Sequence, residues 1–264
     1  MIGKLISHYR ITEQIGIGGM GVVYAAEDTR LLRRVAFKCL SDDVTNDAEA
    51  VRRFRRTAEI IARLNHPNIC TIHDIDEHEG RAFIVMELLE GLNLELFMLK
   101  KTLETLEIIS VGVQITKALE AAHMASIVHR DIKPGNVFVC NTGLVKVLDF
   151  GLARRFRSAD IADAPLDGST NPGRTLGTPN YMVPERFRQM PPDPRSDLFS
   201  LGIVLYQMAT ERLPFAGASP GETVTNILDN DPPLLTSLSP QRPKSLEQVV
   251  NTFLATRAYR TLEP

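Results

Sequence analysis

The sequence predicts a mixed α+β protein with a small β-rich amino-terminal lobe and a larger, mainly helical carboxy-terminal lobe. The first observation is that residues 1–85 contain short apolar runs separated by turn-forming residues, a pattern typical of strands. The second is that after Gly91 apolar residues recur at helical spacing over long stretches. The chain has 264 residues, which allows one large domain or two small ones. We expect the boundary between the lobes near Leu89–Leu92.

The amino-terminal lobe is predicted to combine strands with a single helix. The helix covers Ala48–Leu64, because its apolar residues lie three or four positions apart and form one stripe. This stripe consists of Val51, Phe54, Ala58, Ile61 and Leu64. Strands are expected at Tyr9–Gly16, Val22–Glu27, Val35–Leu40, Ile69–Asp74 and Arg81–Glu87.

The carboxy-terminal lobe is predicted to contain helices and one long loop. Leu103–Met124 is long and periodic, and Ser196–Thr210 and Leu246–Leu254 also have helical spacing. Between the first two helices, Arg155–Pro194 is rich in Asp, Gly, Ser, Thr and Pro. A loop of that length is uncommon in a compact domain, so we expect it to have a function.

Composition narrows the class of protein. The chain has 30 basic and 32 acidic residues and a net charge of −2, which gives no excess positive field for nucleic acid. Its 3 cysteines are too few and too scattered for a disulfide framework or a CxxC zinc site. No apolar run approaches the roughly 18 residues of a membrane helix, and the first residues lack the apolar core of a signal peptide. These features predict a cytoplasmic globular domain.

A glycine cluster lies between the first two predicted strands. Gly16, Gly18 and Gly21 follow a GxGxxG spacing, which lets backbone N–H groups approach phosphate oxygens because no Cβ intervenes. The dinucleotide-binding version of this pattern is followed by a helix, whereas here Val22–Ala25 is typical of a strand. The cluster therefore fits a hairpin lying over a nucleotide better; a plain glycine-rich hairpin is the alternative.

Three further segments carry residues suited to phosphate and metal chemistry. Lys38 ends an apolar strand, where its ammonium would enter a cleft or, alternatively, lie on the surface. His129–Asn136 brings an acidic acceptor, cations and an amide into one short segment. Asp149–Gly151 puts a carboxylate at the end of an apolar run, a plausible arrangement for a Mg²⁺ ligand.

Together, in this order and at these spacings, the motifs resemble those of serine/threonine protein kinases, and most closely the bacterial eukaryotic-like kind. The resemblance extends from about Tyr9 to Arg260. It implies a two-lobed kinase-like fold, with residues 1–89 covering the nucleotide and residues 90–264 forming the catalytic and peptide-binding lobe. It also implies ATP- and Mg²⁺-dependent phosphoryl transfer to serine or threonine of protein substrates.

The resemblance assigns roles to individual residues. Asp131 would accept the proton of the substrate hydroxyl, Lys133 would steady the γ-phosphate, and Lys38 would hold the α- and β-phosphates. The three glycines would cover the phosphates. Mg²⁺ would be bound by Asn136 and Asp149. The predicted adenine pocket consists of Val23, Ala36 and Phe138 around the ring, Met86 as gatekeeper, and the backbones of Glu87 and Leu89.

Further family features lie around the long loop. Gly177–Glu185 resembles the segment that presents the acceptor peptide, and Asp197 resembles the aspartate that anchors the catalytic loop. Glu185 is expected to pair with Arg260. Arg130 precedes Asp131, and an arginine there can pair with a phosphate on the loop. We expect two associated copies to phosphorylate each other on this loop. Thr175 is the first expected site and Thr170 the next, with Ser169 also in range.

One departure from the family pattern bears on activity. The family places a glutamate, the partner of Lys38, ten residues before the proline of His-Pro-Asn; here that position is Thr57. Glu59 is about 200° around the helix from Thr57 and should point away. We therefore expect this ion pair to be absent, unless one of Asp42, Asp43 or Asp47 compensates.

Three functions follow from this pattern. The leading one is a protein kinase with reduced activity. The alternatives are a pseudokinase, which would bind nucleotide as a regulatory or scaffold module, and a small-molecule phosphotransferase, which the peptide-presenting segment disfavours. The smaller departure at Val183, where the family has alanine, should not abolish function. Since the family continues with another helix after the position of Arg260, we also expect a longer parent protein, with room for a sensor and a membrane anchor beyond residue 264.

Overall fold

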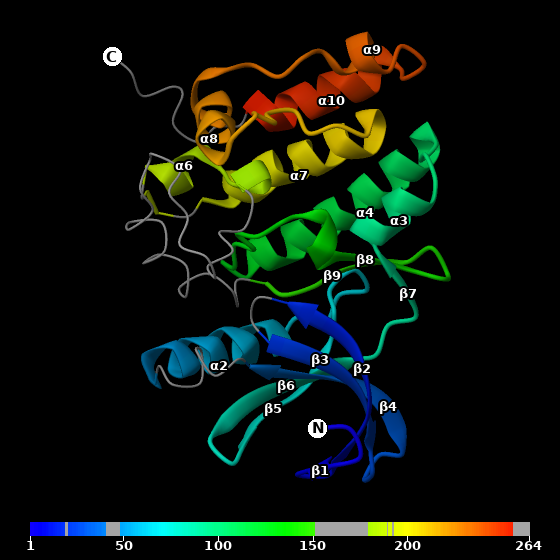
Figure 1. The fold of residues 1–264 in the computed structure, drawn as a ribbon, viewed down its shortest axis with the longest axis vertical. Helices are drawn as coiled ribbons and strands as arrows, with labels where there is room; N and C mark the ends of the chain where they lie inside the picture. The colour runs from blue at the N-terminus through cyan, green and yellow to red at the C-terminus, as the bar shows by residue number, and fades with distance from the viewer. Residues whose placement is uncertain (19–20, 41–47, 151–178, 189, 192, 256–264) are drawn as a thin grey trace.

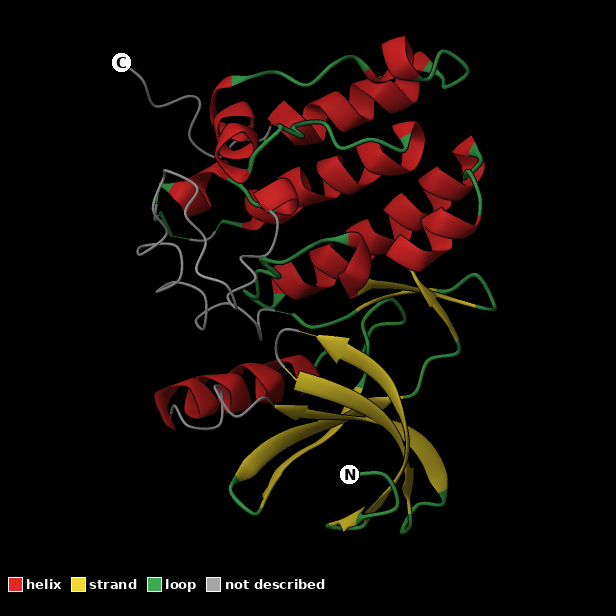
Figure 2. Cartoon of the chain, in the orientation of Figure 1, coloured by secondary structure: helices red, strands yellow, loops and turns green. Residues whose placement is uncertain are grey.

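The computed structural model describes residues 1–18, 21–40, 48–150, 179–188, 190–191 and 193–255. The α+β fold predicted from the sequence is confirmed: a strongly twisted sheet with one flanking helix forms one end of the molecule, and a helical body forms the other (Figure 1). Figure 2 shows that most strands lie in the first of these parts and most helices in the second. Thr170, Thr175 and Arg260 lie outside the described residues.

The amino-terminal sheet is antiparallel and has the strand order β1-β2-β3-β4-β6-β5. Hairpins connect β2 to β3, β3 to β4 and β5 to β6, so strands that are close in sequence pair with one another. Its strands are β1 (Leu5–Ile6), β2 (Tyr9–Gly18), β3 (Gly21–Asp28), β4 (Arg33–Leu40), β5 (Ile72–His78) and β6 (Arg81–Glu87).

The side chains on the two faces of β4 have different surroundings. Successive side chains of a strand point to opposite faces. Val35 and Phe37 are fully buried on one face, where the Phe37 ring stacks on Phe83 of β6 at 4.5 Å between centroids. Ala36 and Lys38 therefore occupy the opposite face. This alternation places the lysine on the side of the sheet away from that aromatic cluster.

Helix α2 (Ala48–Ala62) packs beside β5, as Figure 1 shows. Its predicted apolar stripe is confirmed, because Phe54, Ala58 and Ile61 are all buried in the main core. The helix ends two residues before the predicted end at Leu64. Burial of this stripe fixes which face of α2 looks toward the body of the protein.

The carboxy-terminal part contains a small antiparallel sheet as well as helices. The sheet has the order β7-β8-β9, and it lies between the amino-terminal sheet and α4 in Figure 1. The sequence patterns did not identify these three short strands. Their bounds are β7 (Gly91–Asn93), β8 (Val137–Cys140) and β9 (Val145–Val147), with the 3-10 turn η1 (Pro134–Asn136) leading into β8.

The helices of this part follow the expected positions with shifted ends. Helix α4 begins at Thr105 because Glu104 and Glu107 form a capping box there. Helix α7 begins at Pro194, two residues before the prediction, because the Asp193 side chain accepts the N–H of Arg195. The helices are α3 (Leu94–Lys100), α4 (Thr105–Met124), α6 (Pro184–Phe187), α7 (Pro194–Thr210), α8 (Pro220–Asp229), α9 (Leu235–Leu238) and α10 (Lys244–Ala255), with the 3-10 turn η2 at Pro179–Tyr181.

One predicted strand begins in the wrong place, and the reason matters for the site. The prediction was Ile69–Asp74, whereas β5 starts at Ile72. The preceding segment instead runs parallel to β9: the N–H of Cys70 donates to the carbonyl of Val147 at 3.0 Å, and the N–H of Val147 donates to the carbonyl of Asn68 at 2.8 Å. These bonds tie the two parts of the molecule together beside the connection between β6 and β7.

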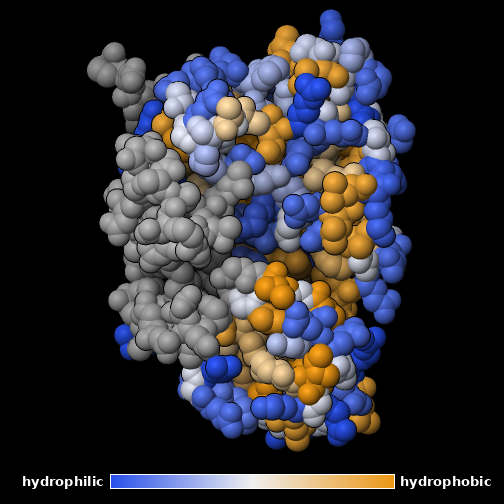
Figure 3. Space-filling model, viewed as in Figure 1, coloured by the Kyte–Doolittle hydropathy of each residue, from blue (hydrophilic) through white to orange (hydrophobic). Residues whose placement is uncertain are grey.

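The larger of two apolar clusters continues across both parts, and the smaller one, around Phe37 and Phe83, lies within the amino-terminal sheet. The larger cluster includes Ile61 and Ile84 from the amino-terminal part and Ile115, Phe150 and Phe199 from the carboxy-terminal part. The space-filling view shows the surface hollowed between the two parts on one face (Figure 3). Among the residues that the structure describes, no helix has both the length and the apolar character needed to cross a bilayer.

Candidate active site

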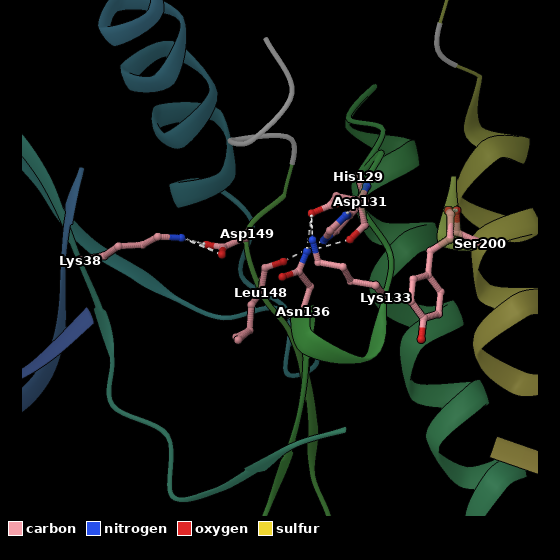
Figure 4. A network of polar contacts seen from close by, with 9 residues as sticks. Lys38, His129, Asp131, Lys133, Asn136, Leu148, Asp149 and Ser200 are labelled. Carbon is pink, nitrogen blue, oxygen red and sulfur yellow. Dashed lines mark hydrogen bonds and ion pairs between the residues drawn. The ribbon is translucent and has the colours of Figure 1, made fainter. Parts of the chain in front are cut away.

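Lys38 and Asp149, which are 111 residues apart in sequence, meet in the space between the two parts (Figure 4). The Lys38 ammonium donates to both carboxylate oxygens of Asp149 at 2.7 Å. The side chain of Lys38 is only 6% exposed, so the alternative that this lysine lies on the surface is wrong. Asp149 has a φ of 57°, which turns its carboxylate toward β4 at the cost of a left-handed backbone.

The charge state of this pair follows from two opposing effects on Asp149. Burial alone raises the pKa of a carboxyl group, because it penalises the charged form. The positive charge and hydrogen bonds of Lys38 outweigh burial here, so the pKa of Asp149 lies below its ordinary value. Asp149 is therefore a carboxylate at neutral pH, and the contact is an ion pair.

None of the α2 side chains that the structure describes supplies an acid to this pair; the side chain of Glu49 is not among them. Thr57 is partly buried and Glu59 is exposed, as the helical geometry predicted. Asp149 is the one carboxylate seen to contact the Lys38 ammonium among the described side chains. The three acids considered as substitutes, Asp42, Asp43 and Asp47, lie outside the described residues.

Asp131, Lys133 and Asn136 converge on one another in the loop before β8 (Figure 4). The Lys133 ammonium donates to Oδ2 of Asp131 at 2.7 Å. The amide nitrogen of Asn136 donates to the same oxygen at 2.9 Å and to the backbone carbonyl of Asp131 at 2.8 Å. Both donors approach Oδ2, so Oδ1 of Asp131 has no hydrogen bond from any described residue.

The backbone of this loop is hydrogen-bonded to a buried carboxylate of α7. Asp197 is 0% exposed and accepts the backbone N–H groups of His129 and Arg130, each at 2.7 Å. His123, near the end of α4, also contacts Asp197 at 2.8 Å. The predicted anchoring role of Asp197 therefore has a geometric basis. These bonds hold Arg130 in its left-handed conformation, with φ at 70°.

His129 links the loop to the segment after β9 that carries Asp149. Its Nδ1 accepts the N–H of Asp131 at 3.2 Å, which requires the proton of a neutral ring to be on Nε2. Nε2 then donates to the carbonyl of Leu148 at 2.8 Å. The ring also packs on Phe150 at 4.6 Å between centroids. Asp131 and Asp149 are thus positioned by the same buried imidazole.

Asn136 and Asp149 are suitably placed to share a cation. The carbonyl of Asn136 accepts the N–H of Leu148, so the two candidate ligands lie on adjacent segments. The side-chain nitrogen of Asn136 is engaged by Asp131, which leaves the amide oxygen as the atom available to a metal. An amide oxygen and a carboxylate are ligands that Mg²⁺ accepts. Elsewhere in the described chain, no cluster of three or more His, Cys, Asp or Glu side chains could hold a metal.

The predicted adenine residues come from both sheets. In the antiparallel register Val23 is opposite Lys38, and Ala36 is opposite Met86. Directly opposed residues share a face, so these side chains lie on the same face of the sheet as Lys38. Phe138 comes from β8 of the small sheet. The register thus groups the residues expected from the amino-terminal side; their contact with adenine stays a prediction.

An ion pair between a buried lysine and a half-buried glutamate was not predicted from the sequence. Lys146 of β9 donates to Oε1 of Glu87 at 2.6 Å and to the carbonyl of Ile69 at 3.3 Å. Glu87 also accepts the N–H of Thr71 with the same side-chain oxygen, at 2.7 Å. Lys146 is buried, and the pair crosses from one part of the molecule to the other. A lysine in a strand of alternating Val residues gives no local sign of such a partner.

The glycine cluster has two kinds of glycine. Gly21 has a φ of 142°, and a Cβ there would lie 1.8 Å from the carbonyl oxygen of Cys39, so the fold itself requires glycine. Among the described residues, a Cβ on Gly16 would meet only Val23, at an ordinary 3.8 Å. Gly18 ends β2 opposite Gly21, and the two residues between them lie outside the described chain. Gly16 is therefore the glycine whose identity the fold leaves unexplained.

The segment expected to present the acceptor peptide is described from Pro179 onward. The Tyr181 hydroxyl donates to Gln207 at 2.6 Å, and Ser200 donates to the Tyr181 carbonyl at 3.1 Å. Glu185 is buried and accepts a hydrogen bond from the Ser196 hydroxyl. Its predicted partner Arg260 lies outside the described residues. Helix α7 thus supports both this segment and the catalytic loop.

Comparisons with known proteins agree with this arrangement. The family model described as "Protein kinase domain" matches residues 9–258. The serine/threonine-protein kinase PrkC of Bacillus subtilis is 39% identical over 252 residues, which are 95% of this chain and 38% of that protein. PknA of Mycobacterium tuberculosis is 37% identical over 257 residues, 95% of this chain and 57% of that protein. The chain thus spans well under two thirds of the length of these relatives.

Solved structures give the same result for the fold. The kinase domain of Mycobacterium tuberculosis PknI matches with a TM-score of 0.75 and 26% identity, over 97% of this chain and 91% of that one. The resemblance inferred from the glycine cluster, Lys38, the His129–Asn136 segment and Asp149–Gly151 is confirmed. Taken with the geometry of these residues, the match over nearly the whole chain shows that the chain belongs to the protein kinase family.

Proposed function

We propose that this chain transfers the γ-phosphoryl group of ATP to a serine or threonine hydroxyl of a protein substrate. The observation that carries the proposal is the convergence of Asp131, Lys133 and Asn136 next to the Lys38–Asp149 pair. Phosphoryl transfer needs little covalent chemistry from the protein and depends on positioning and charge neutralisation. Each of these side chains suits one of those two tasks.

Asp131 is the proposed acceptor of the hydroxyl proton. Lys133 and Asn136 both occupy its Oδ2, which leaves Oδ1 for the substrate hydroxyl. The hydroxyl oxygen forms a bond to the γ-phosphorus while the bond from that phosphorus to the ADP oxygen breaks. The hydroxyl proton passes to the Asp131 carboxylate, and Lys133 offsets the negative charge of the transferred group.

Asn136 and Asp149 are the proposed holders of Mg²⁺, and Lys38 is the proposed partner of the α- and β-phosphates. When bound, Mg²⁺ would neutralise phosphate charge. Val23, Ala36 and Phe138 would enclose the adenine, with Met86 as gatekeeper and the backbones of Glu87 and Leu89 as hydrogen-bond partners. Gly16, Gly18 and Gly21 would cover the phosphates. In this proposal residues 1–89 and 90–264 are the two lobes, and the nucleotide lies between them.

We further propose that the transfer is slower than in a kinase that has a glutamate at position 57. Lys38 is buried, and Asp149 is its one carboxylate partner among the described side chains, so the ammonium and the proposed metal ligand neutralise each other. Phosphate must compete with Asp149 for Lys38. The same observation favours a second candidate, a pseudokinase that binds nucleotide without transferring phosphate.

One experiment separates these two candidates. The protein is incubated with Mg-ATP, with and without a generic basic protein as acceptor, beside Asp131→Asn. A kinase should lose about 10²–10⁴-fold in rate in the variant, the usual contribution of a positioned general base. A wild-type rate no higher than that of Asp131→Asn indicates the pseudokinase. Mass spectrometry of residues 155–183 in the same samples tests autophosphorylation at Thr175 and Thr170.

A further inference from the structure

The hairpin between β3 and β4 presents two leucines to solvent at the far end of the amino-terminal sheet. Leu31 is 65% exposed and Leu32 is 80% exposed. Strand β4 reaches the active site at Lys38, near its other end, so these leucines lie away from the helical body. Figure 1 shows this end of the sheet at the bottom, beside β1. The proposed phosphate transfer makes no use of it.

The backbone of Leu32 is in a conformation that leucine disfavours. Its φ is 51°, in the left-handed region, where a Cβ is crowded and glycine or asparagine is preferred. Because the side chain is exposed, burial within the described chain does not offset this strain. Asparagine would fit the turn better, so the fold gives no reason for a leucine here. An exposed and strained apolar side chain indicates a contact outside the chain.

Positive charges surround the two leucines. The strand registers place Leu5, Arg10, Glu27 and Arg34 in one row across β1 to β4, next to the hairpin, and all four are exposed. Glu27 lies between two arginines, and Arg30 adds another exposed cation at the hairpin itself. The chain as a whole has a net charge of −2, so this excess of positive charge is local. Figure 3 shows apolar and hydrophilic atoms intermingled at this end.

The acids near this surface do not cancel its charge. Asp28 is buried and shapes the hairpin, where it accepts the N–H of Arg30 at 3.0 Å. Glu13 reaches Arg34 only at 3.9 Å, and both side chains are exposed. Neither Arg10 nor Arg30 has a carboxylate partner among the described residues. Their cations are therefore available to an anion outside the chain.

We propose that this end of the sheet docks on an anionic phospholipid surface. Leu31 and Leu32 would insert among the headgroups, while Arg10, Arg30 and Arg34 would lie against lipid phosphates. Buried apolar area and attraction to anionic lipid are the two contributions that hold a protein at a bilayer interface. A second copy of this chain suits the surface less well, because two-fold pairing would bring arginines against arginines. Such docking is independent of phosphate transfer.

Vesicle co-sedimentation tests the docking. Vesicles of phosphatidylcholine with phosphatidylglycerol should bind the chain, and binding should fall as NaCl is added because salt screens the attraction. Vesicles of phosphatidylcholine alone should bind it far more weakly. Leu31→Asn combined with Leu32→Asn should lower the partition coefficient about tenfold. Arg30→Gln should lower it about fivefold, the usual effect of one cation near an anionic surface.

Matched controls lie elsewhere on the surface. Leu99 and Leu106 are each 79% exposed, so Leu99→Asn combined with Leu106→Asn removes a similar amount of exposed apolar side chain from α3 and α4. Arg52→Gln removes an exposed cation from α2. Neither change should alter vesicle binding. Leu32→Asn alone should melt at or above the wild-type temperature, because asparagine tolerates the left-handed turn.

A tryptophan reports insertion directly, because the chain has none. Leu31→Trp should shift its emission to shorter wavelength on vesicles that contain phosphatidylglycerol, and brominated lipid should quench it. Leu106→Trp is the control and should show neither change. These two readouts separate insertion of the hairpin from adsorption of the cations alone.

Three outcomes contradict the proposed docking: no preference for phosphatidylglycerol, an equal loss in the Leu99 and Leu106 control, or an unchanged emission of Leu31→Trp on vesicles. Analytical ultracentrifugation checks the other occupant. Dimers that form without lipid and disappear when Leu31 and Leu32 are both replaced by asparagine would assign this surface to a second copy instead.

Discussion

The catalytic loop and the Lys38 side of the site face each other, yet the protein holds them in different ways. The catalytic loop is fastened by a buried carboxylate, Asp197, and a buried imidazole, His129, each of which makes two or more hydrogen bonds. Among the described side chains, the Lys38 ammonium contacts one partner, Asp149, which is itself a proposed metal ligand. One side is positioned by residues that have no proposed role in the reaction, and the other by a residue that is proposed to take part in it.

This difference indicates where the site is preorganised. Preorganised dipoles and charges need no rearrangement when the transition state forms, and that is the main source of electrostatic catalysis. The Asp131 side meets this condition before any ligand arrives. On the Lys38 side, the ion pair must open before either partner can bind its proposed ligand. The comparison makes three predictions, given below from the largest expected effect to the smallest.

Asp197→Asn should weaken the anchoring of the catalytic loop and cause the largest loss of stability of the three variants. The amide keeps one oxygen, so one of the two backbone N–H groups of His129 and Arg130 would face an NH₂ group instead of an acceptor. Losing a buried, charge-assisted hydrogen bond costs about 2–4 kcal/mol. Denaturant unfolding measures this loss. The control is Asp193→Asn on the same helix, where Asn is an equally good cap and the change should be under about 0.5 kcal/mol. Equal losses in the two variants would contradict the anchoring role.

Lys146→Met should show how the amino-terminal sheet is tied to the carboxy-terminal part. Removing the ammonium leaves Glu87 without its partner, but Glu87 is 25% exposed, so the cost is below that of a fully buried charge. We expect a loss of about 1–3 kcal/mol in the free energy of unfolding and weaker binding of ADP.

Adding Glu87→Gln to Lys146→Met gives the matched test. Without the unpaired charge, the double variant should recover part of the lost stability. If the two single losses simply add, the pair is not an energetic link, and the geometry at the end of β6 must be held by its backbone bonds alone.

Thr57→Glu should give the Lys38 ammonium a further partner, and we expect the smallest of the three effects from it. A carboxylate on the inner face of α2 would give Lys38 a second partner and release Asp149 from its exclusive pairing. We expect about 1 kcal/mol of transition-state stabilisation, which is roughly a fivefold higher rate of phosphate transfer. Thr57→Gln has the same length without the charge and should give no increase. An unchanged rate in Thr57→Glu would sink the explanation based on the missing glutamate.

Much of the site could be predicted because its residues sit in short, ordered motifs. Asp131, Lys133 and Asn136 lie within six positions, so their meeting needs only a local loop. The inward face of α2 followed from helical spacing, which also placed Glu59 on the exposed side. Short strands such as β7 and β9 could not be found, because three residues are too few to show a period of two.

The sequence by itself determined which chemical groups are present, their order, and the periodic faces of the longer helices, because these depend on neighbours within a turn or two. Only the tertiary structure decided which distant groups are partners: Lys38 with Asp149, Lys146 with Glu87, and Asp197 with the backbone of the catalytic loop. Hydrogen bonds and ion pairs act over a few ångströms, and the packing of two sheets and the α7 core sets those distances. The sequence therefore predicted a kinase-like site with one missing acid, and the structure identified the carboxylate that Lys38 contacts in its place.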